Sequence, residues 1–318
     1  MKHLIIDANN LLYRAHFVSK LTDEKGNRVS GIFNSIRMVQ NLMRKFKPDS
    51  VVVVWDKGKS RARLAIFPEY KSQRDKNRKE QDVIDLQKQR LMLQKIFDYL
   101  PVKQVQLEGV EADDIIGWLV REKLKGKKII VSNDTDFIQL VDKKVNLFLP
   151  NKANLLTPLN VDKHLGFPAK HYVLWKSMVG DNSDNIKGIH GIGPKKATAI
   201  ILNGVGGKKK LPINETEMAI LDKNKYLIAI GAVLQDDDIK QIKKAYKTAK
   251  ETANDVKFSQ IRKIFKELNF KSLLYQFEEI EAQFKKITRK EPNGQKIKKE
   301  KVGTRSTSEN KKSKIRKK

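Results

Sequence analysis

Val51-Val52-Val53-Val54-Trp55-Asp56 is an unbroken run of five apolar residues that ends at an acid. Two shorter runs, Leu4-Ile5-Ile6 and Ile129-Ile130-Val131, have the same unalternating character, and Asp7 follows the first of them. Short continuous apolar runs rich in β-branched residues are typical of strands buried on both faces of a parallel sheet. We therefore expect these three runs to form the centre of a mostly parallel sheet.

Amphipathic stretches lie between these runs, and their apolar residues have helical spacing. The predicted helices are residues 32–46, 83–100 and 112–124, and two further strands are predicted at 102–107 and 145–149. Strands that alternate with helices predict an α/β fold, so we assign residues 1–157 to an α/β domain. Strand signals stop near Pro158, and residues 158–284 predict a helical second region.

The composition favours a polyanionic partner. The 66 Lys and Arg residues exceed the 37 Asp and Glu residues, which gives a net charge of +29. With no cysteine, disulfides and thiolate zinc sites are excluded. Because no apolar run approaches the roughly 20 residues that span a bilayer, we expect a cytoplasmic protein without a membrane partner. Residues 285–318 hold 15 Lys or Arg against three Glu and predict a disordered basic tail.

Acidic residues follow the predicted strands, where ligands bind in open α/β sheets. The set comprises Asp7, Asp56, Glu111, Asp113, Asp114, Asp134 and Asp136, and it is joined by Asp181 and Asp184, which would share one helical face. Nine converging carboxylates would repel one another unless cations compensate them. Magnesium suits oxygen ligands of this kind, and two such ions about 4 Å apart can hydrolyse a phosphodiester.

Each acid also has a simpler interpretation. A single Asp after a strand is most often a helix cap or a turn residue, and the acids at 111–114 alone would favour a helix N-terminus. Repetition of acids after one predicted strand after another favours the metal site.

Six segments resemble, in order, the motifs of the 5′-nuclease family, which includes bacteriophage 5′-exonucleases and the N-terminal nuclease domain of bacterial DNA polymerase I. The segments are Asp7-Ala8-Asn9-Asn10-Leu11-Leu12-Tyr13-Arg14, Asp56-Lys57-Gly58-Lys59-Ser60, Phe67-Pro68-Glu69-Tyr70-Lys71-Ser72-Gln73-Arg74, Glu111-Ala112-Asp113-Asp114, Asn133-Asp134-Thr135-Asp136 and Gly180-Asp181-Asn182-Ser183-Asp184-Asn185. The resemblance implies a PIN-like nuclease domain and an active enzyme, since none of the family's acids is missing.

The resemblance also implies how the acids divide between two Mg²⁺ ions, for which Mn²⁺ could substitute. One ion would be held mainly by Asp56, Glu111, Asp113 and Asp114, and the other mainly by Asp134, Asp136, Asp181 and Asp184. Asp7 would lie nearby and act through water.

Residues 57–82 are expected to form a basic arch. Between residues 57 and 79 there are nine Lys and Arg residues and two acids. This run of positive charge could alternatively be an ordinary solvated surface. The family resemblance implies an arch that admits single-stranded 5′ ends, with Lys71 on the scissile phosphate and Arg74 assisting it. Tyr70 could stack on a base, or it could be a partly buried structural residue.

Residues 188–197 read as a Gly-rich turn that opens a helix. Gly191 and Gly193 would let the backbone approach a phosphate, and Lys195 and Lys196 would add phosphate contacts. The turn resembles the family's helix-hairpin-helix element, here expected at 184–203, which grips duplex DNA and commonly holds K⁺.

These observations predict a structure-specific 5′-nuclease with 5′→3′ exonuclease and flap endonuclease modes. We expect a monomer that acts on flapped, nicked or 5′-ended DNA and on RNA primers in hybrids, in replication or repair. The tail could touch DNA or dock a single-stranded-DNA-binding protein. Two rivals stay open at this point: a toxin-like ribonuclease, which would lack the arch and the Gly-rich turn, and a non-catalytic architectural DNA-binding protein, which would lack the acids.

Overall fold

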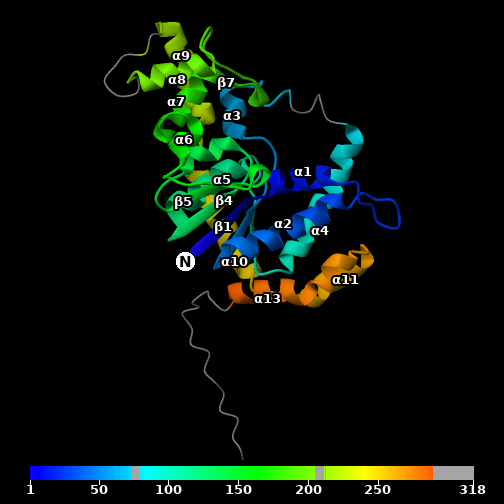
Figure 1. Ribbon diagram of the computed structural model, residues 1–318. Helices are drawn as coiled ribbons and strands as arrows, with labels where there is room; N and C mark the ends of the chain where they lie inside the picture. Colours follow the sequence, from blue (N-terminus) through cyan, green and yellow to red (C-terminus); the bar gives the residue numbers. More distant parts are fainter. Residues whose placement is uncertain (74–78, 205–210, 212, 289–318) are drawn as a thin grey trace, which may run out of the picture.

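A six-stranded sheet forms the centre of the molecule in the computed structural model, which describes residues 1–73, 79–204, 211 and 213–288 (Figure 1). The spatial order is β3-β2-β1-β4-β5-β6, and only β6 is antiparallel to its neighbour. The strands are β1 (Lys2–Asp7), β2 (Ser50–Val54), β3 (Lys103–Val105), β4 (Lys127–Val131), β5 (Val145–Leu149) and β6 (Asn154–Leu156). The mostly parallel α/β sheet predicted from the sequence is therefore confirmed.

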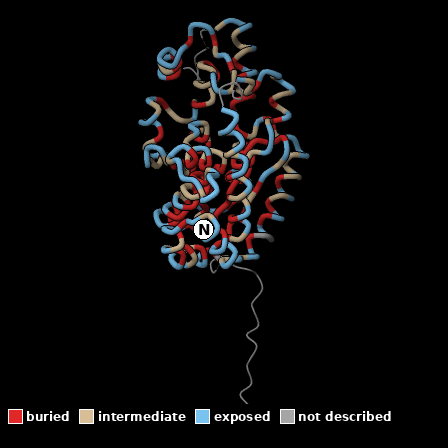
Figure 2. Tube along the Cα trace, turned by 90° about the vertical axis from the view of Figure 1, so that its right-hand side faces the viewer, coloured by how far each residue is buried: buried red, intermediate tan, exposed pale blue. Residues whose placement is uncertain are grey.

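The unalternating runs are explained by burial on both faces of the sheet. In β1, Ile5 packs into one hydrophobic cluster while Leu4 and Ile6 pack into another on the opposite face. Ile5 lies in register with Val52 of β2 and Ile130 of β4, which join the same cluster. Buried residues accordingly fill the interior between layers of helices (Figure 2).

Helices cover both faces of this sheet. The face of Leu4 and Ile6 is covered by α1 (Ala8–Val18), α2 (Ser30–Phe46) and α4 (Glu80–Asp98), and then by α11 (Phe258–Glu267), α12 (Lys271–Tyr275) and α13 (Phe277–Thr288). The cluster on the other face includes α5 (Ala112–Trp118), η1 (Leu119–Lys123), η2 (Thr135–Leu140), α7 (Tyr172–Val179), α8 (Pro194–Leu202), α9 (Glu215–Ile228) and α10 (Asp236–Thr252). The remaining short elements are α3 (Arg61–Ile66), η3 (Pro150–Lys152), α6 (Val161–Leu165), η4 (Ala169–His171), β7 (Gly180–Asp181), η5 (Asn182–Asp184) and β8 (Ile186–Lys187).

The structure differs from the sequence prediction in several elements. The helices α1 and α3 and the edge strand β6 were not expected, and the helix expected at 112–124 ends in the π-helical turn η1. The predicted second region is not one unit: α6 to α9 extend beyond the sheet, whereas α10 packs on β3 and α13 packs on α2. That region also holds a small antiparallel pair, β7 and β8.

The C-terminal boundary was also predicted too early. Helix α13 continues to Thr288 and buries Ile287, so residues 285–288 belong to the fold and not to a tail. The rest of the predicted tail lies outside the described residues. None of the helices in the described ranges combines the length and the apolar character that crossing a membrane requires.

Candidate active site

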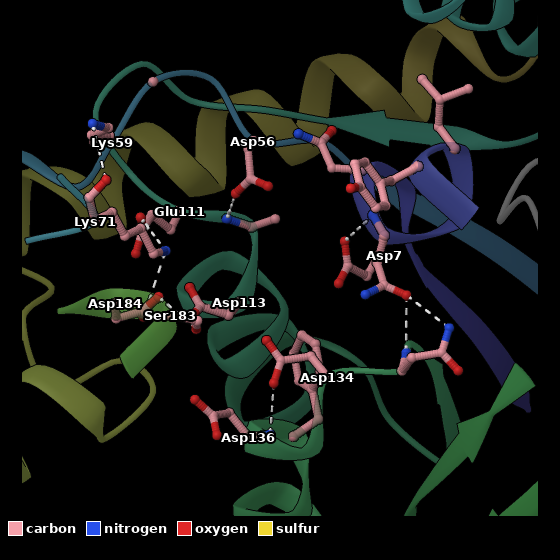
Figure 3. Close-up of a pocket in the computed structure, with 18 of the residues that line it drawn as sticks. Asp7, Asp56, Lys59, Lys71, Glu111, Asp113, Asp134, Asp136, Ser183 and Asp184 are labelled. Atoms are coloured by element: carbon pink, nitrogen blue, oxygen red, sulfur yellow. Dashed lines mark hydrogen bonds and ion pairs between the residues drawn. The ribbon is translucent and has the colours of Figure 1, made fainter. Parts of the chain in front are cut away.

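The acids converge where the direction of the chain around the sheet reverses. β1 leads through β2 to β3 on one side, whereas β4 leads to β5 and β6 on the other, so the switch point lies between β1 and β4. A cavity of about 870 Å³ opens there (Figure 3). Eight of the nine predicted acids line it: Asp7, Asp56, Glu111, Asp113, Asp134, Asp136, Asp181 and Asp184.

Asp7 and Asp134 serve as caps and also face the cavity. Asp7 ends β1 and caps α1, accepting hydrogen bonds from Asn10 N at 3.2 Å and Ser132 Oγ at 2.8 Å. Asp134 caps η2 by accepting from Asp136 N at 2.8 Å. Burial and then the charge of Asp56 raise the pKa of Asp7 to about 8, and burial and then Asp136 raise the pKa of Asp134 to about 7. The simple cap interpretation is therefore correct for both residues, yet both remain in the cavity.

Asp56 and Glu111 reach the cavity from the ends of β2 and of the loop that follows β3. Asp56 accepts a hydrogen bond from Ala112 N at 2.8 Å, which fixes it against the first turn of α5. Glu111 accepts from Lys71 Nζ at 2.6 Å through one oxygen and from Tyr70 Oη at 2.9 Å through the other. Burial raises the pKa of both carboxylates, and the charge of Asp113 raises it further.

Asp181 and Asp184 lie around the 3₁₀ turn η5, in place of the α-helical face expected from their spacing. Asp181 accepts from Ser183 N at 2.8 Å, and its Oδ2 lies 2.7 Å from Lys176 Nζ. Burial would raise the pKa of Asp181, but the charge of Lys176 and the hydrogen bonds from Lys176 and Ser183 outweigh it and lower that pKa. Asp184 accepts from Tyr70 Oη at 3.2 Å.

Asp114 does not face the cavity, in contrast to the sequence prediction. Its carboxylate is fully buried and receives two hydrogen bonds from Arg63, at 2.5 and 3.0 Å, and one from Gly231 N at 2.7 Å. Burial and then Asp113 raise its pKa to about 6 despite this pairing. Carboxylate oxygens of Glu111, Asp113 and Asp114 do lie within 4.8 Å of one another. Asp114 therefore lies in one acidic cluster with Glu111 and Asp113, while its carboxylate is also the partner of Arg63 and of Gly231 N.

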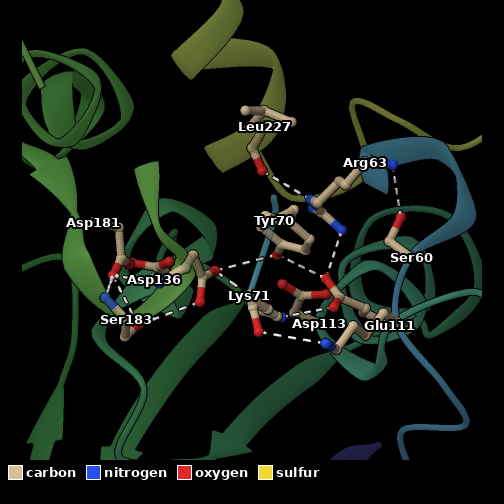
Figure 4. Close-up of polar contacts among 12 residues, drawn as sticks. Ser60, Arg63, Tyr70, Lys71, Glu111, Asp113, Asp136, Asp181, Ser183 and Leu227 are labelled. Carbon is tan, nitrogen blue, oxygen red and sulfur yellow. Dashed lines mark hydrogen bonds and ion pairs between the residues drawn. The ribbon is translucent and has the colours of Figure 1, made fainter. Parts of the chain in front are cut away.

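Two residues of the expected arch are buried instead of facing DNA (Figure 4). Tyr70 is 2% exposed, so its ring is not available to stack on a base, and it is the structural residue of the alternative interpretation. Arg63 is 1% exposed and donates to Glu111 at 3.0 Å and to the carbonyl of Leu227 at 2.8 Å. Within the segment 57–82, Tyr70 is thus anchored to the acids, and Arg63 is anchored both to the acids and to α9.

Lys71 lies at the edge of the cavity in a constrained backbone conformation. Its φ is 57°, in the left-handed region, and its N–H donates to the carbonyl of Asp184 at 3.0 Å. Strained backbone of this kind is concentrated at functional sites. Arg74 falls outside the described residues.

The Gly-rich turn has the predicted form. Gly191 has φ 71° and leads to α8, which begins at Pro194. A side chain built at Gly191 or Gly193 would meet nothing within 4 Å, so the backbone there is open to a ligand. Lys195 and Lys196 are exposed on the first turn of α8. The helix before the turn is α7, so the β7–β8 pair separates it from the turn.

Sequence reasoning missed Lys176, Tyr172 and the role of Arg63. Lys176 and Tyr172 lie one turn apart on α7, and both bond to Asp136, 40 and 36 residues earlier in the chain. Burial alone would lower the pKa of Lys176, but Asp136 and then Tyr172 and Asp181 raise it. The available signal was a lysine inside the apolar run of residues 172–179, which is unusual for a buried helix face.

Comparisons with known proteins show which family the chain resembles. The family model described as 5'-3' exonuclease, N-terminal resolvase-like domain matches residues 2–166. The 5'-3' exonuclease of Buchnera aphidicola subsp. Schizaphis graminum is 30% identical over 236 residues, covering 70% of this chain and 80% of that protein. DNA polymerase I of Caldicellulosiruptor bescii is 35% identical over 210 residues, covering 63% of this chain and 24% of the polymerase.

Solved structures share the fold. A bacteriophage T5 flap endonuclease in a pseudo-enzyme–product complex with DNA and metal ions superposes with a TM-score of 0.63 at 24% identity, covering 80% of this chain and all of that one. The family model spans half of the chain, and the Buchnera relative is matched over most of its length. The chain therefore belongs to the 5'-3' exonuclease family.

Proposed function

We propose that the protein is a structure-specific 5′-nuclease that hydrolyses DNA phosphodiesters at flaps, nicks and 5′ ends with the help of two Mg²⁺ ions. The observation that carries the proposal is the convergence of eight carboxylates on one cavity in a chain of net charge +29. Such a site needs compensating cations, while the surrounding positive charge favours a polyanionic substrate. Flap endonuclease and 5′→3′ exonuclease activity would share this one cavity.

The donor set fits hard divalent cations. Only oxygen ligands are offered by the acids, and these are the ligands that Mg²⁺ and Mn²⁺ prefer. Two lysine ammonium groups already lie against these oxygens, since Lys71 approaches Glu111 and Lys176 approaches Asp181 at 2.6 and 2.7 Å. The cavity therefore attracts positive charge at two separate places.

The acids would divide between two ions according to the walls they occupy. Asp56, Glu111, Asp113 and Asp114 would hold one ion, while Asp134, Asp136, Asp181 and Asp184 would hold the other, with Asp7 acting through water. When bound, two such ions supply an activated water and stabilise the leaving oxygen of a phosphodiester. Lys71 would place its ammonium on the scissile phosphate, with Arg74 beside it, where negative charge develops.

The basic turn would hold the duplex beside this cavity. Lys195, Lys196 and the open backbone of Gly191 and Gly193 would contact phosphates without reading sequence, and a K⁺ ion could bind the carbonyls of the turn. We further propose that RNA primers in hybrids are cleaved, that the protein works as a monomer in the cytoplasm, and that a single-stranded-DNA-binding protein is a possible partner of the basic tail.

One cleavage experiment tests the proposal. A 5′-labelled flap, a nicked duplex, an RNA–DNA hybrid and single-stranded RNA would be incubated with Mg²⁺, with Ca²⁺ and with a chelator. We expect cleavage of the flap near its junction with Mg²⁺ only, leaving a 5′-phosphate. Preferential cleavage of single-stranded RNA would favour a toxin-like ribonuclease, and binding without cleavage would favour an architectural protein.

A further inference from the structure

A partly buried lysine that the sequence analysis did not single out lies between two of the acids. Lys176 is on α7, and its side chain is 14% exposed. Its Nζ lies 2.7 Å from Asp181 Oδ2 and forms an ion pair with Asp136 Oδ1. These acids come from different elements, η2 and the end of β7, so one ammonium joins two walls of the cavity.

The ammonium is held at this place by its neighbours. Tyr172, one turn earlier on the same helix, donates to Asp136 Oδ1 at 2.9 Å and orients that carboxylate. Trp175 anchors α7 by donating from Nε1 to Thr198 Oγ1 at 3.0 Å on α8. Tyr172 and α7 therefore fix the geometry of the lysine and its acids.

Lys71, another of the lysines that line the cavity, differs from Lys176 in what surrounds it. Lys71 contacts Glu111, which also receives hydrogen bonds from Arg63 and Tyr70. If Lys71 moved, Arg63 would still neutralise Glu111. For Asp136 and Asp181, the ion pairs in the described part of the chain both run to Lys176. Among the described residues, Lys176 is therefore the cation that neutralises these two acids.

We propose that Lys176 is a built-in cation that takes the place of a divalent ion between Asp136 and Asp181 and has to move aside when that ion binds. This inference rests on the proposed metal-dependent function. A lysine ammonium and a metal ion compete for the same carboxylate oxygens, so Lys176 weakens metal binding in this half of the cavity. Its flexible four-carbon stem allows it to shift, and an incoming phosphate offers the displaced ammonium a new partner.

Two consequences follow from the competition. Removing the charge of Lys176 strengthens divalent-ion binding in the absence of DNA. It also reduces the increase in metal affinity that DNA produces, because the wild-type ammonium gains a phosphate partner only when substrate is present. Such coupling is reciprocal, so the metal ion would raise DNA affinity by the same factor. Lys176 thus makes the binding of a divalent ion between Asp136 and Asp181 depend on the presence of DNA.

The test measures Ca²⁺ binding to the full chain by calorimetry, with and without flapped DNA. Lys176→Met and Lys176→Gln remove the charge, Lys176→Arg keeps it, and Lys170→Met removes an exposed charge from the same region as the matched control. Two Ca²⁺ ions are expected to bind with different affinities. We expect Lys176→Met and Lys176→Gln to bind the more weakly held ion about tenfold more tightly than Lys170→Met does, because one close competing charge is lost. Lys176→Arg should bind like wild type.

A second measurement needs no variant. Amine-reactive labelling of the wild-type protein, read by mass spectrometry, should show Lys176 becoming more reactive when Ca²⁺ is added, with Lys170 as internal reference. Ca²⁺ affinity in Lys176→Met and Lys176→Gln no tighter than in Lys170→Met, or labelling unchanged by Ca²⁺, would overturn the inference. Failure of wild-type protein to bind any divalent ion would instead refute the proposed function.

Discussion

Asp134 and Asp181 offer the most direct test of the metal site, because they reach the cavity from separate elements. Asp134→Asn or Asp181→Asn should abolish cleavage, since each removes a charge that would hold an ion. DNA binding should survive because the basic turn is intact. Gel-shift and cleavage assays would be compared with Asp222→Asn, whose side chain is 63% exposed on α9. A remaining rate above about a tenth of wild type, or about 1.4 kcal/mol, would contradict the assignment.

Lys71 should act in the chemical step and not in binding. A contact made mainly in the transition state lowers turnover when it is removed, and losing one such donor typically costs about 10²–10³ in rate. Lys71→Ala should therefore lower the single-turnover rate by this amount at nearly unchanged DNA affinity. Lys95→Ala, on the exposed surface of α4, is the control. Unchanged chemistry with weaker binding would make Lys71 an ordinary phosphate contact.

Arg63 should matter for stability as much as for catalysis. Its guanidinium is the partner of the buried carboxylates of Asp114 and Glu111. Removing one member of such a buried network typically costs about 3–5 kcal/mol because charge is left unpaired. We expect Arg63→Met to lower the free energy of unfolding in urea by this amount. Arg61→Met, two residues away and 63% exposed, should change it by less than about 1 kcal/mol. Equal losses in the two variants would show that the network is not what stabilises this region.

The sequence predicts which residues lie at the sheet edge where an apolar run sets their position along a strand, whereas Asp181 and Asp184 were predicted on a helical face and lie around the 3₁₀ turn η5. Asp7, Asp56 and Asp134 follow apolar runs, so their place at the sheet edge was predictable. Asp113 and Asp114 are adjacent on α5, and only the packing of that helix against Arg63 decides that Asp113 faces the cavity while Asp114 does not. Lys176 lies 40 residues from its partner Asp136, so no local pattern could pair them.

Among the elements, the turn before α8 should contribute affinity without selecting the cleavage site. Each Lys that neutralises a phosphate releases counterions, so replacing Lys195 and Lys196 by Ala should reduce the slope of log affinity against log salt by about 2. The position of cleavage on a flapped duplex should not change. The control is the double Ala variant of Lys243 and Lys244, exposed on α10. Equal slopes in the turn variant and wild type would show that the turn does not touch the backbone.

The elements that sequence reasoning missed are short or continuous with their neighbours. Helix α1 begins directly after β1 with Asp7 as its cap, so no loop signals its start. Strand β6 is three residues long and only its last residue is buried. The three central predicted strands, in contrast, hold unalternating apolar runs, which are typical of a sheet buried on both faces.

The whole molecule should show an unusual dependence of stability on pH when no metal is present. Asp7 and Asp134 have folded-state pKa values of about 8 and about 7, above the usual 3.9 of an unfolded chain. Between the unfolded and the folded pKa of each carboxyl, the folded state keeps a proton that the unfolded state has lost. The free energy of unfolding therefore falls as pH rises through this range, by about 1.4 kcal/mol per pH unit for each such proton.

Urea unfolding in chelator at pH 5.5 and pH 8 measures this effect. We expect lower stability at pH 8 and a gain on adding Ca²⁺ that is larger at pH 8 than at pH 5.5, because ions compensate the ionised carboxylates. Asp7→Asn should flatten the pH dependence. Equal stability of the metal-free protein at both pH values would contradict the assigned burial of these acids.

The contact between α13 and α2 has a consequence for how the protein is made. Ion pairing of Arg44 with Glu279 at 2.8 Å and the packing of Phe33 against Phe270 join the start of the chain to its last described helices. During synthesis, α1 and α4 can cover part of α2 early, but the part that Phe270 and α13 cover stays exposed until residues up to 288 have left the ribosome. We expect this exposed apolar part of α2 to make the nascent chain a client of chaperones that bind growing polypeptides.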